Sequence, residues 1–122
     1  MAKVRWLEAP EAHDFPAAGD YLDLLAEPHI VKQLTDKLRA GTVVHKFAKD
    51  ILRAAQLSLL PSDNPHVAAD LAKIKKKQSL SPILLIRGDY ATGVPLQIAD
   101  GYHRVCASYY TDENTDIPVV LV

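Results

Sequence analysis

The fold is decided by the stretch Ile98-Ala99-Asp100-Gly101-Tyr102-His103-Arg104. Its first residues complete a strand predicted at residues 96–99, and a helix is predicted to begin near His103. Glycine allows the backbone to turn sharply between the two and lets a ligand approach closely. The stretch therefore predicts a tight strand-to-helix junction.

The same junction carries the candidate chemistry. The start of a helix presents unpaired N–H groups and a partial positive charge. Arg104 adds a planar fork of donors for phosphate oxygens, and His103 can donate a hydrogen bond or move a proton near neutral pH. Asp100 could orient either side chain, coordinate Mg²⁺ beside a phosphate, or cap the helix. Asp100 and His103 are thus the catalytic candidates, and the alternative is a plain helix start with a surface arginine and a capping aspartate.

On both sides of the junction, the sequence pattern of the second half of the chain predicts helices that alternate with strands. Asn64 can cap a helix that begins at Pro65, after a short extended piece at residues 57–60. Residues 83–86 form a near-continuous apolar run, which suits a strand covered on both faces. A closing strand is predicted from residue 117, and Pro118 is expected to place its start near a sheet edge.

The first half predicts mainly helices. A short strand is expected at residues 3–7, followed by helices around 21–25, from Pro28 to a glycine cap at 41, and from a Thr42 cap through residue 55. This segment has amphipathic faces and no chemical signature. We expect it to form a helical layer that covers one sheet face or makes a dimer contact.

Composition limits the class of protein. The chain has 122 residues, which predicts a single domain, and its 14 basic and 15 acidic side chains give no global positive field for nucleic acid or anionic lipid. The lone cysteine, Cys106, excludes an internal disulfide and a multi-cysteine zinc site. No apolar run approaches the roughly 20 residues of a membrane span. The expected location is the cytoplasm, with no membrane partner.

Residues 57–122 resemble the ParB/sulfiredoxin superfamily. The resemblance is carried, in chain order, by residues 59–65, 82–88, 98–104 and 117–119. It implies an α/β (α+β) domain with a small mixed sheet at the core. Residues 1–56, with one strand and helices, are expected to form an N-terminal extension to that core.

The resemblance also implies a function. In the sulfiredoxin branch the His and Arg of the motif bind ATP phosphates, in the ParB branch an Arg-rich motif binds CTP, and other relatives transfer phosphoryl groups. The implied cofactor is a nucleoside triphosphate with Mg²⁺, and the implied partner is a nucleotide or a phosphorylated small molecule. The residues implied to bind them are Gly101, Tyr102, His103 and Arg104 of the motif, and Asn64, His66 and Lys73 at the helix expected to face it.

Two departures from the family pattern reduce the number of activities that the resemblance implies. Tyr102 stands where sulfiredoxins have their catalytic cysteine, so repair of cysteine sulfinate is not expected. The chain ends at Val122, where ParB proteins continue into a helix-turn-helix and a dimerisation region, so partition activity is not expected either. The leading hypothesis is phosphoryl transfer or nucleotide hydrolysis at the motif. The alternatives are a non-catalytic binding or regulatory module and, least favoured, a DNA-associated protein; a homo-oligomer stays open.

Overall fold

A computed structural model describes residues 3–122. Its centre is a mixed four-stranded sheet in the order β2-β6-β4-β5, accompanied by a two-stranded parallel pair, β1 and β3. The elements in chain order are β1 (Arg5–Trp6), α1 (Asp14–Leu22), α2 (Pro28–Ala40), β2 (Val43–Phe47), α3 (Ala48–Ala55), α4 (Pro65–Lys75), β3 (Ser79–Leu80), β4 (Ile83–Ile86), β5 (Gln97–Asp100), α5 (Tyr102–Thr111) and β6 (Asp116–Leu121).

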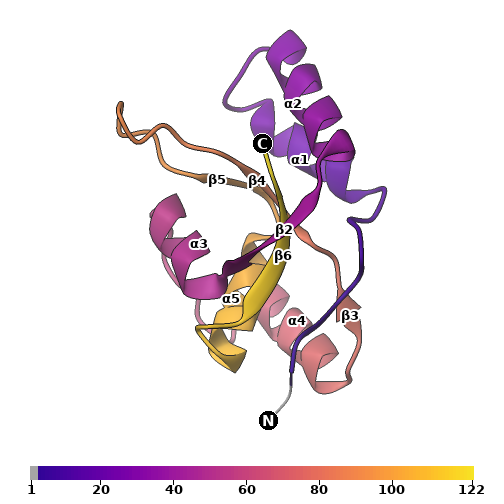
Figure 1. Cartoon of the computed structure of the whole chain (residues 1–122). Helices are drawn as coiled ribbons and strands as arrows, with labels where there is room; N and C mark the ends of the chain where they lie inside the picture. The colour runs from indigo at the N-terminus through magenta and orange to yellow at the C-terminus, as the bar shows by residue number, and fades with distance from the viewer. Residues whose placement is uncertain (1–2) are drawn as a thin grey trace.

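Helices cover the sheet on both sides (Figure 1), which confirms the predicted α/β class. Successive side chains along a strand point to opposite faces of the sheet, so each central strand contributes residues to two hydrophobic clusters. Leu84 and Val120 pack with α1 and α2, whereas Ile83 and Val119 pack with α3, α4 and α5. The prediction of a strand buried on both faces is therefore confirmed for β4.

The segment expected to be one helix from Thr42 to residue 55 contains a strand, and that prediction is wrong. Residues 43–47 form β2, which pairs antiparallel with β6, and the helix begins only at Ala48. Apolar residues at 43, 44, 47 and 51 fit helical spacing, but two adjacent β-branched valines also suit a strand, and pairing with β6 decides between the two. The N-terminal extension therefore contains a second strand beside the one expected at residues 3–7, and this strand forms an edge of the sheet.

Other boundaries also move. The helix expected around residues 21–25 ends at Leu22, and Leu24 beyond it is 82% exposed. Residues 57–60 form no strand. Pro118 does not lie at a sheet edge, because β6 is flanked by β2 and β4. Pairing with β4 starts at Val119, so the missing N–H of the proline falls before the first β4–β6 pair.

Predictions that rest on local signals are confirmed. The Asn64 side chain accepts hydrogen bonds from the backbone N–H groups of His66 and Val67, at 3.0 and 3.2 Å, and so caps α4. The helices α1 and α2 form a layer over one sheet face, which was one of the two roles expected for the extension. None of the helices in residues 3–122 is long and apolar enough to cross a membrane.

Candidate functional site

Gly101 forms the junction between β5 and α5. Its φ of +113° lies in the region that favours glycine, and it stands at the N-cap of α5 without a side-chain capping bond. A Cβ at this position would lie 2.5 Å from Ile83 Cδ1 and 2.8 Å from Arg104 Nη2. The close packing around Gly101 requires a residue without a side chain, and the first N–H groups of α5 have no side-chain cap.

A hollow of about 270 Å³ opens at this junction. One wall is the exposed side of α4 and the other is the first turn of α5, so segments far apart in the sequence meet here. The lining residues are His66, Ala69, Asp70, Lys73, Asp100, Gly101, His103 and Arg104. Most of the residues that the sequence implied for phosphate binding therefore come together in one place.

Two histidines lie side by side in the lining of the hollow. The ring centroids of His66 and His103 are 4.7 Å apart, with the ring planes tilted by 41°. Burial lowers the pKa of His103 below its ordinary value, and the nearby His66 and Arg104 lower it further, while Asp70 opposes them. His103 is thus held neutral near pH 7, as a hydrogen-bond donor and acceptor that an arriving anion would help to protonate.

Asp70 belongs to this hollow and is missing from the sequence-based candidates. Burial raises the pKa of its carboxyl, against the opposing charges of Lys73, Arg104 and the histidines. Residues 66, 70 and 73 follow the spacing that places side chains on one helix face, and that pattern could have revealed it.

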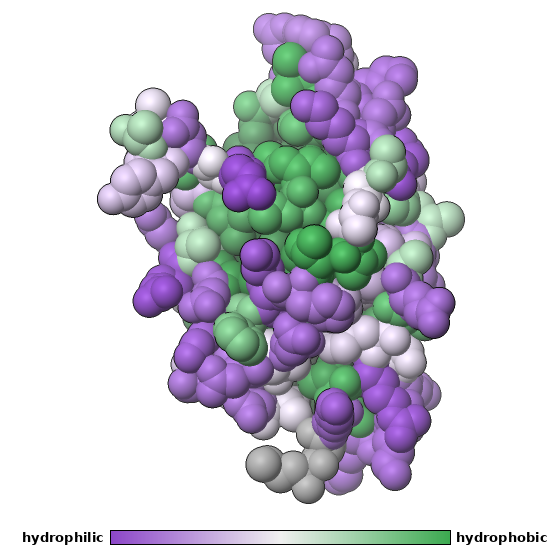
Figure 2. Space-filling model, in the orientation of Figure 1, coloured by the Kyte–Doolittle hydropathy of each residue, from purple (hydrophilic) through white to green (hydrophobic). Residues whose placement is uncertain are grey.

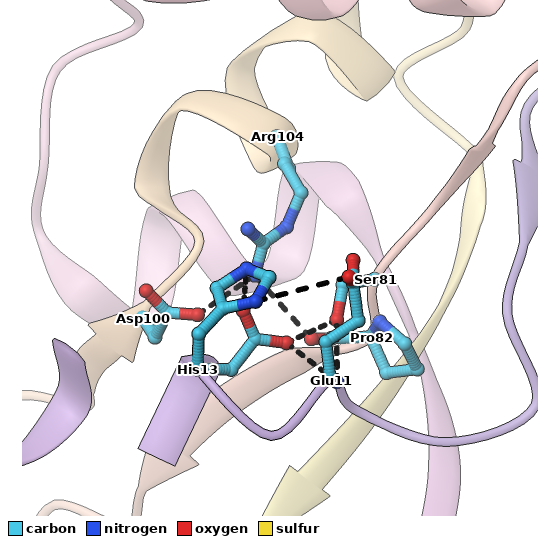
Figure 3. A network of polar contacts seen from close by, with 7 residues as sticks. Glu11, His13, Ser81, Pro82, Asp100 and Arg104 are labelled. Atoms are coloured by element: carbon cyan, nitrogen blue, oxygen red, sulfur yellow. Dashed lines mark hydrogen bonds and ion pairs between the residues drawn. The ribbon is translucent and has the colours of Figure 1, made fainter. Parts of the chain in front are cut away.

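Arg104 is already engaged inside the fold (Figure 3). Its Nη2 donates to Asp100 Oδ2 at 3.0 Å and to the carbonyl oxygen of Pro82 at 3.4 Å. The side chain is 18% exposed, and its buried Nε has no acceptor within residues 3–122. Of the roles open to Asp100, orienting Arg104 is the one observed; it does not cap α5. Only Nη2 is committed to the fold in this way, so Arg104 brings positive charge to the hollow with the rest of its guanidinium unpaired within residues 3–122.

A buried aspartate lies on the other side of this ion pair, and sequence reasoning missed it. Asp14, at the start of α1, is 2% exposed and accepts hydrogen bonds from Ser81 Oγ and from the backbone N–H of Glu11, the latter at 2.9 Å. His13 Nε2 lies 3.4 Å from its other oxygen. Burial raises the pKa of Asp100, and the neighbouring Asp14 carboxyl adds to that rise against the pull of Arg104. The network in Figure 3 thus ties the N-terminal segment to the floor of the junction.

Two predicted phosphate ligands do not line the hollow. The Asn64 side chain is used to cap α4. The Tyr102 hydroxyl donates to the carbonyl oxygen of Ser58 at 2.5 Å and so fixes the chain that precedes α4. Cys106 is fully buried, and burial raises the pKa of its thiol, so it packs as an apolar residue.

The described residues, 3–122, contain no group of three or more His, Cys, Asp or Glu side chains that could hold a metal ion. Comparisons of the chain with family models, with curated proteins and with solved structures find no match. The geometry of the hollow is therefore the basis for inferring a function.

Proposed function

We propose that the hollow between α4 and α5 binds the phosphate group of a nucleotide or of a small phosphorylated molecule. The observation that carries the proposal is the convergence of Lys73, His103 and the uncapped start of α5 on one cavity. A helix N-terminus with a cation and a hydrogen-bonding side chain beside it is a favourable environment for an anion.

The size of the cavity limits what it holds. About 270 Å³ is smaller than the roughly 300–1,000 Å³ of sites that enclose a whole small ligand. A phosphate or short polyphosphate would occupy it, with any sugar and base lying outside. The balanced charge of the chain and its lone cysteine favour action in the cytoplasm.

The resemblance of residues 57–122 to the ParB/sulfiredoxin superfamily extends the proposal to a nucleoside triphosphate with Mg²⁺. Asp70 is the carboxylate that would hold the ion, because Asp100 is paired with Arg104. Magnesium commonly uses one or two carboxylates together with substrate phosphates, so the residues present fit the group. When bound, Mg²⁺ would neutralise part of the negative charge of the phosphate oxygens.

Titration calorimetry with inorganic phosphate, ATP, CTP and GTP, each with and without Mg²⁺, tests the proposal. Lys73→Ala should weaken binding about tenfold, the usual effect of losing a charge-assisted hydrogen bond. Lys75→Ala is the matched control, because Lys75 lies on the same helix outside the hollow. No binding of any of these ligands at millimolar concentration would refute the proposal.

A second candidate is binding without turnover. The observation that favours it is the Asp100–Arg104 ion pair. Asp100 is the acid/base candidate predicted from the sequence, and its carboxylate is already paired. Phosphate release from bound nucleotide that disappears in His103→Gln would decide for phosphoryl transfer or hydrolysis. Binding with no release would decide for a regulatory module.

A further inference from the structure

A larger hollow of about 590 Å³ lies away from the phosphate site and shares no lining residue with it. It is bordered by α3, by the ends of β4 and β6, and by the connection at residues 88–95, which projects beyond the sheet (Figure 1). Its volume falls within the range of sites that enclose small organic ligands. The phosphate proposal gives this hollow no role.

The inner surface of this hollow is mainly apolar. Ile51 and Leu85 are buried core residues, and Leu96 and Leu121 are partly buried against the same core. Val94, on the projecting connection, is 51% exposed and completes the lining. Figure 2 shows apolar surface gathered in the middle of one face of the molecule and bordered by hydrophilic residues. An apolar surface lining a concave site favours a ligand with an apolar body.

The charged residues of the lining differ in their partners. Asp50 Oδ1 lies 3.3 Å from Arg53 Nη2, and Asp89 Oδ1 accepts the backbone N–H of Ala91 at 3.0 Å. Within residues 3–122, Lys46 and Arg87 have no ion-pair or side-chain hydrogen-bond partner. Arg53 neutralises Asp50 from outside the lining, so the lining keeps two cations, Lys46 and Arg87, against one carboxylate, Asp89, and is complementary to a negative group.

We propose that this hollow is a second binding site, for a small amphipathic anion with an aliphatic or aromatic body and a carboxylate or sulfonate head. The body packs on Leu85, Leu96 and Leu121, and the head lies between Lys46 and Arg87. The site is independent of the phosphate proposal, because the two hollows have no residue in common.

The experiment uses the full chain and 1-anilinonaphthalene-8-sulfonate as the fluorescent probe. The native protein should bind the probe with one-to-one stoichiometry, and octanoate should displace it, whereas octylammonium and inorganic phosphate should not. Arg87→Gln and Lys46→Gln should each weaken probe binding about three- to tenfold. Lys49→Gln is the matched control, since Lys49 is an exposed cation close in sequence and outside the lining.

Val94→Asp is a second variant that keeps the fold intact, because Val94 is exposed. The substitution places a negative charge in the lining and should weaken binding of the probe at least tenfold. The ellipticity of the variant should equal that of the parent protein. Equal displacement by octanoate and octylammonium, or equal effects of Arg87→Gln and Lys49→Gln, would overturn the proposal. A dimer that dissociates on Val94→Asp substitution, with the probe bound only to the monomer, would assign the surface to a second copy and also overturn it.

Discussion

Replacing Gly101 with alanine should destabilise the fold by roughly 2–6 kcal/mol, from two separate causes. A non-glycine residue held at a φ of +113° costs about 1–3 kcal/mol. The added Cβ would also lie 2.5 Å from Ile83 Cδ1 and 2.8 Å from Arg104 Nη2, and such overpacking costs about 1–3 kcal/mol. Neither neighbour can give way freely, because Ile83 is fully buried and Arg104 is bound to Asp100.

Gly93 provides a matched control, because it separates the two causes. Its φ of +76° is also positive, but a Cβ there would have no atom within 4 Å. Gly93→Ala should therefore cost only the conformational part, about 1–2 kcal/mol. The difference between the two variants measures the steric part together with the extra conformational cost of the larger φ at Gly101.

The assay is urea unfolding of both variants and the parent protein, followed by circular dichroism. If the slopes with denaturant agree, shifts in midpoint convert to free energies of unfolding. Gly101→Ala should lie at least about 1 kcal/mol below Gly93→Ala. Equal losses in the two variants would show that the junction is not packed as described, and the argument for the geometry of the hollow would fail with it.

Further predictions concern groups around the junction. Asp14→Ala should cost about 1–3 kcal/mol in urea unfolding, because the buried Ser81 hydroxyl loses its acceptor and the Glu11 N–H keeps only Ser81 Oγ, at 3.2 Å. Asp14→Asn keeps an acceptor and should cost less; an equal loss would contradict this account. Sulfate should bind more tightly as the pH falls below about 6.5, because a bound anion favours the protonated form of His103, whose pKa burial lowers. Calorimetry at low and neutral pH should show that dependence reduced in His103→Gln, and an unchanged dependence would remove His103 from the site. Cys106 is buried and burial raises its thiol pKa, so a disulfide reagent should label it only at the rate of unfolding; fast labelling of the native protein would refute its burial.

The titration of Asp100 has a consequence for stability. Its pKa is raised above the ordinary value of 3.8, so the folded chain holds this proton more tightly than the unfolded chain. The contribution of the group to stability is therefore present below that value and is lost as the pH rises through the folded pKa. Since Asp14 adds to the rise, the Asp14→Asn variant should show a smaller loss over this interval in unfolding curves measured at successive pH values.

Local chemistry explains which parts of the fold could be predicted. Asn64 and Pro65 define the start of α4 within a few residues of sequence, and the apolar run at 83–86 has no polar residue to face solvent. Pairing between strands that are distant in the chain gives no comparable local signal in the sequence. Residues 43–47 fit a helix or a strand equally well until β6 is placed beside them, and the position of Pro118 depends on the same pairing.

The candidate site follows the same rule. His66 and Lys73 were expected opposite the Gly101 junction only on the proposed resemblance, and the structure brings them there. The presence of Asp70 at the site could have been predicted, because it lies four residues after His66 on the same face of α4. Asp14 carried no signal, because its partner Ser81 is 67 residues away and only the folded chain brings the two together.

The role of the N-terminal segment changes how the chain should be divided. The proposed resemblance covers residues 57–122 alone, but the face of the sheet that bears Leu84, Ala99 and Val120 is covered by α1 and α2. The same segment supplies β2 at one edge of the sheet and Asp14 beneath the Asp100–Arg104 pair. Without it, an apolar sheet face would meet water and Ser81 would lose its acceptor. The physical unit that supports the hollow between α4 and α5 is therefore the whole described chain, and the extension is as much a part of it as the motif.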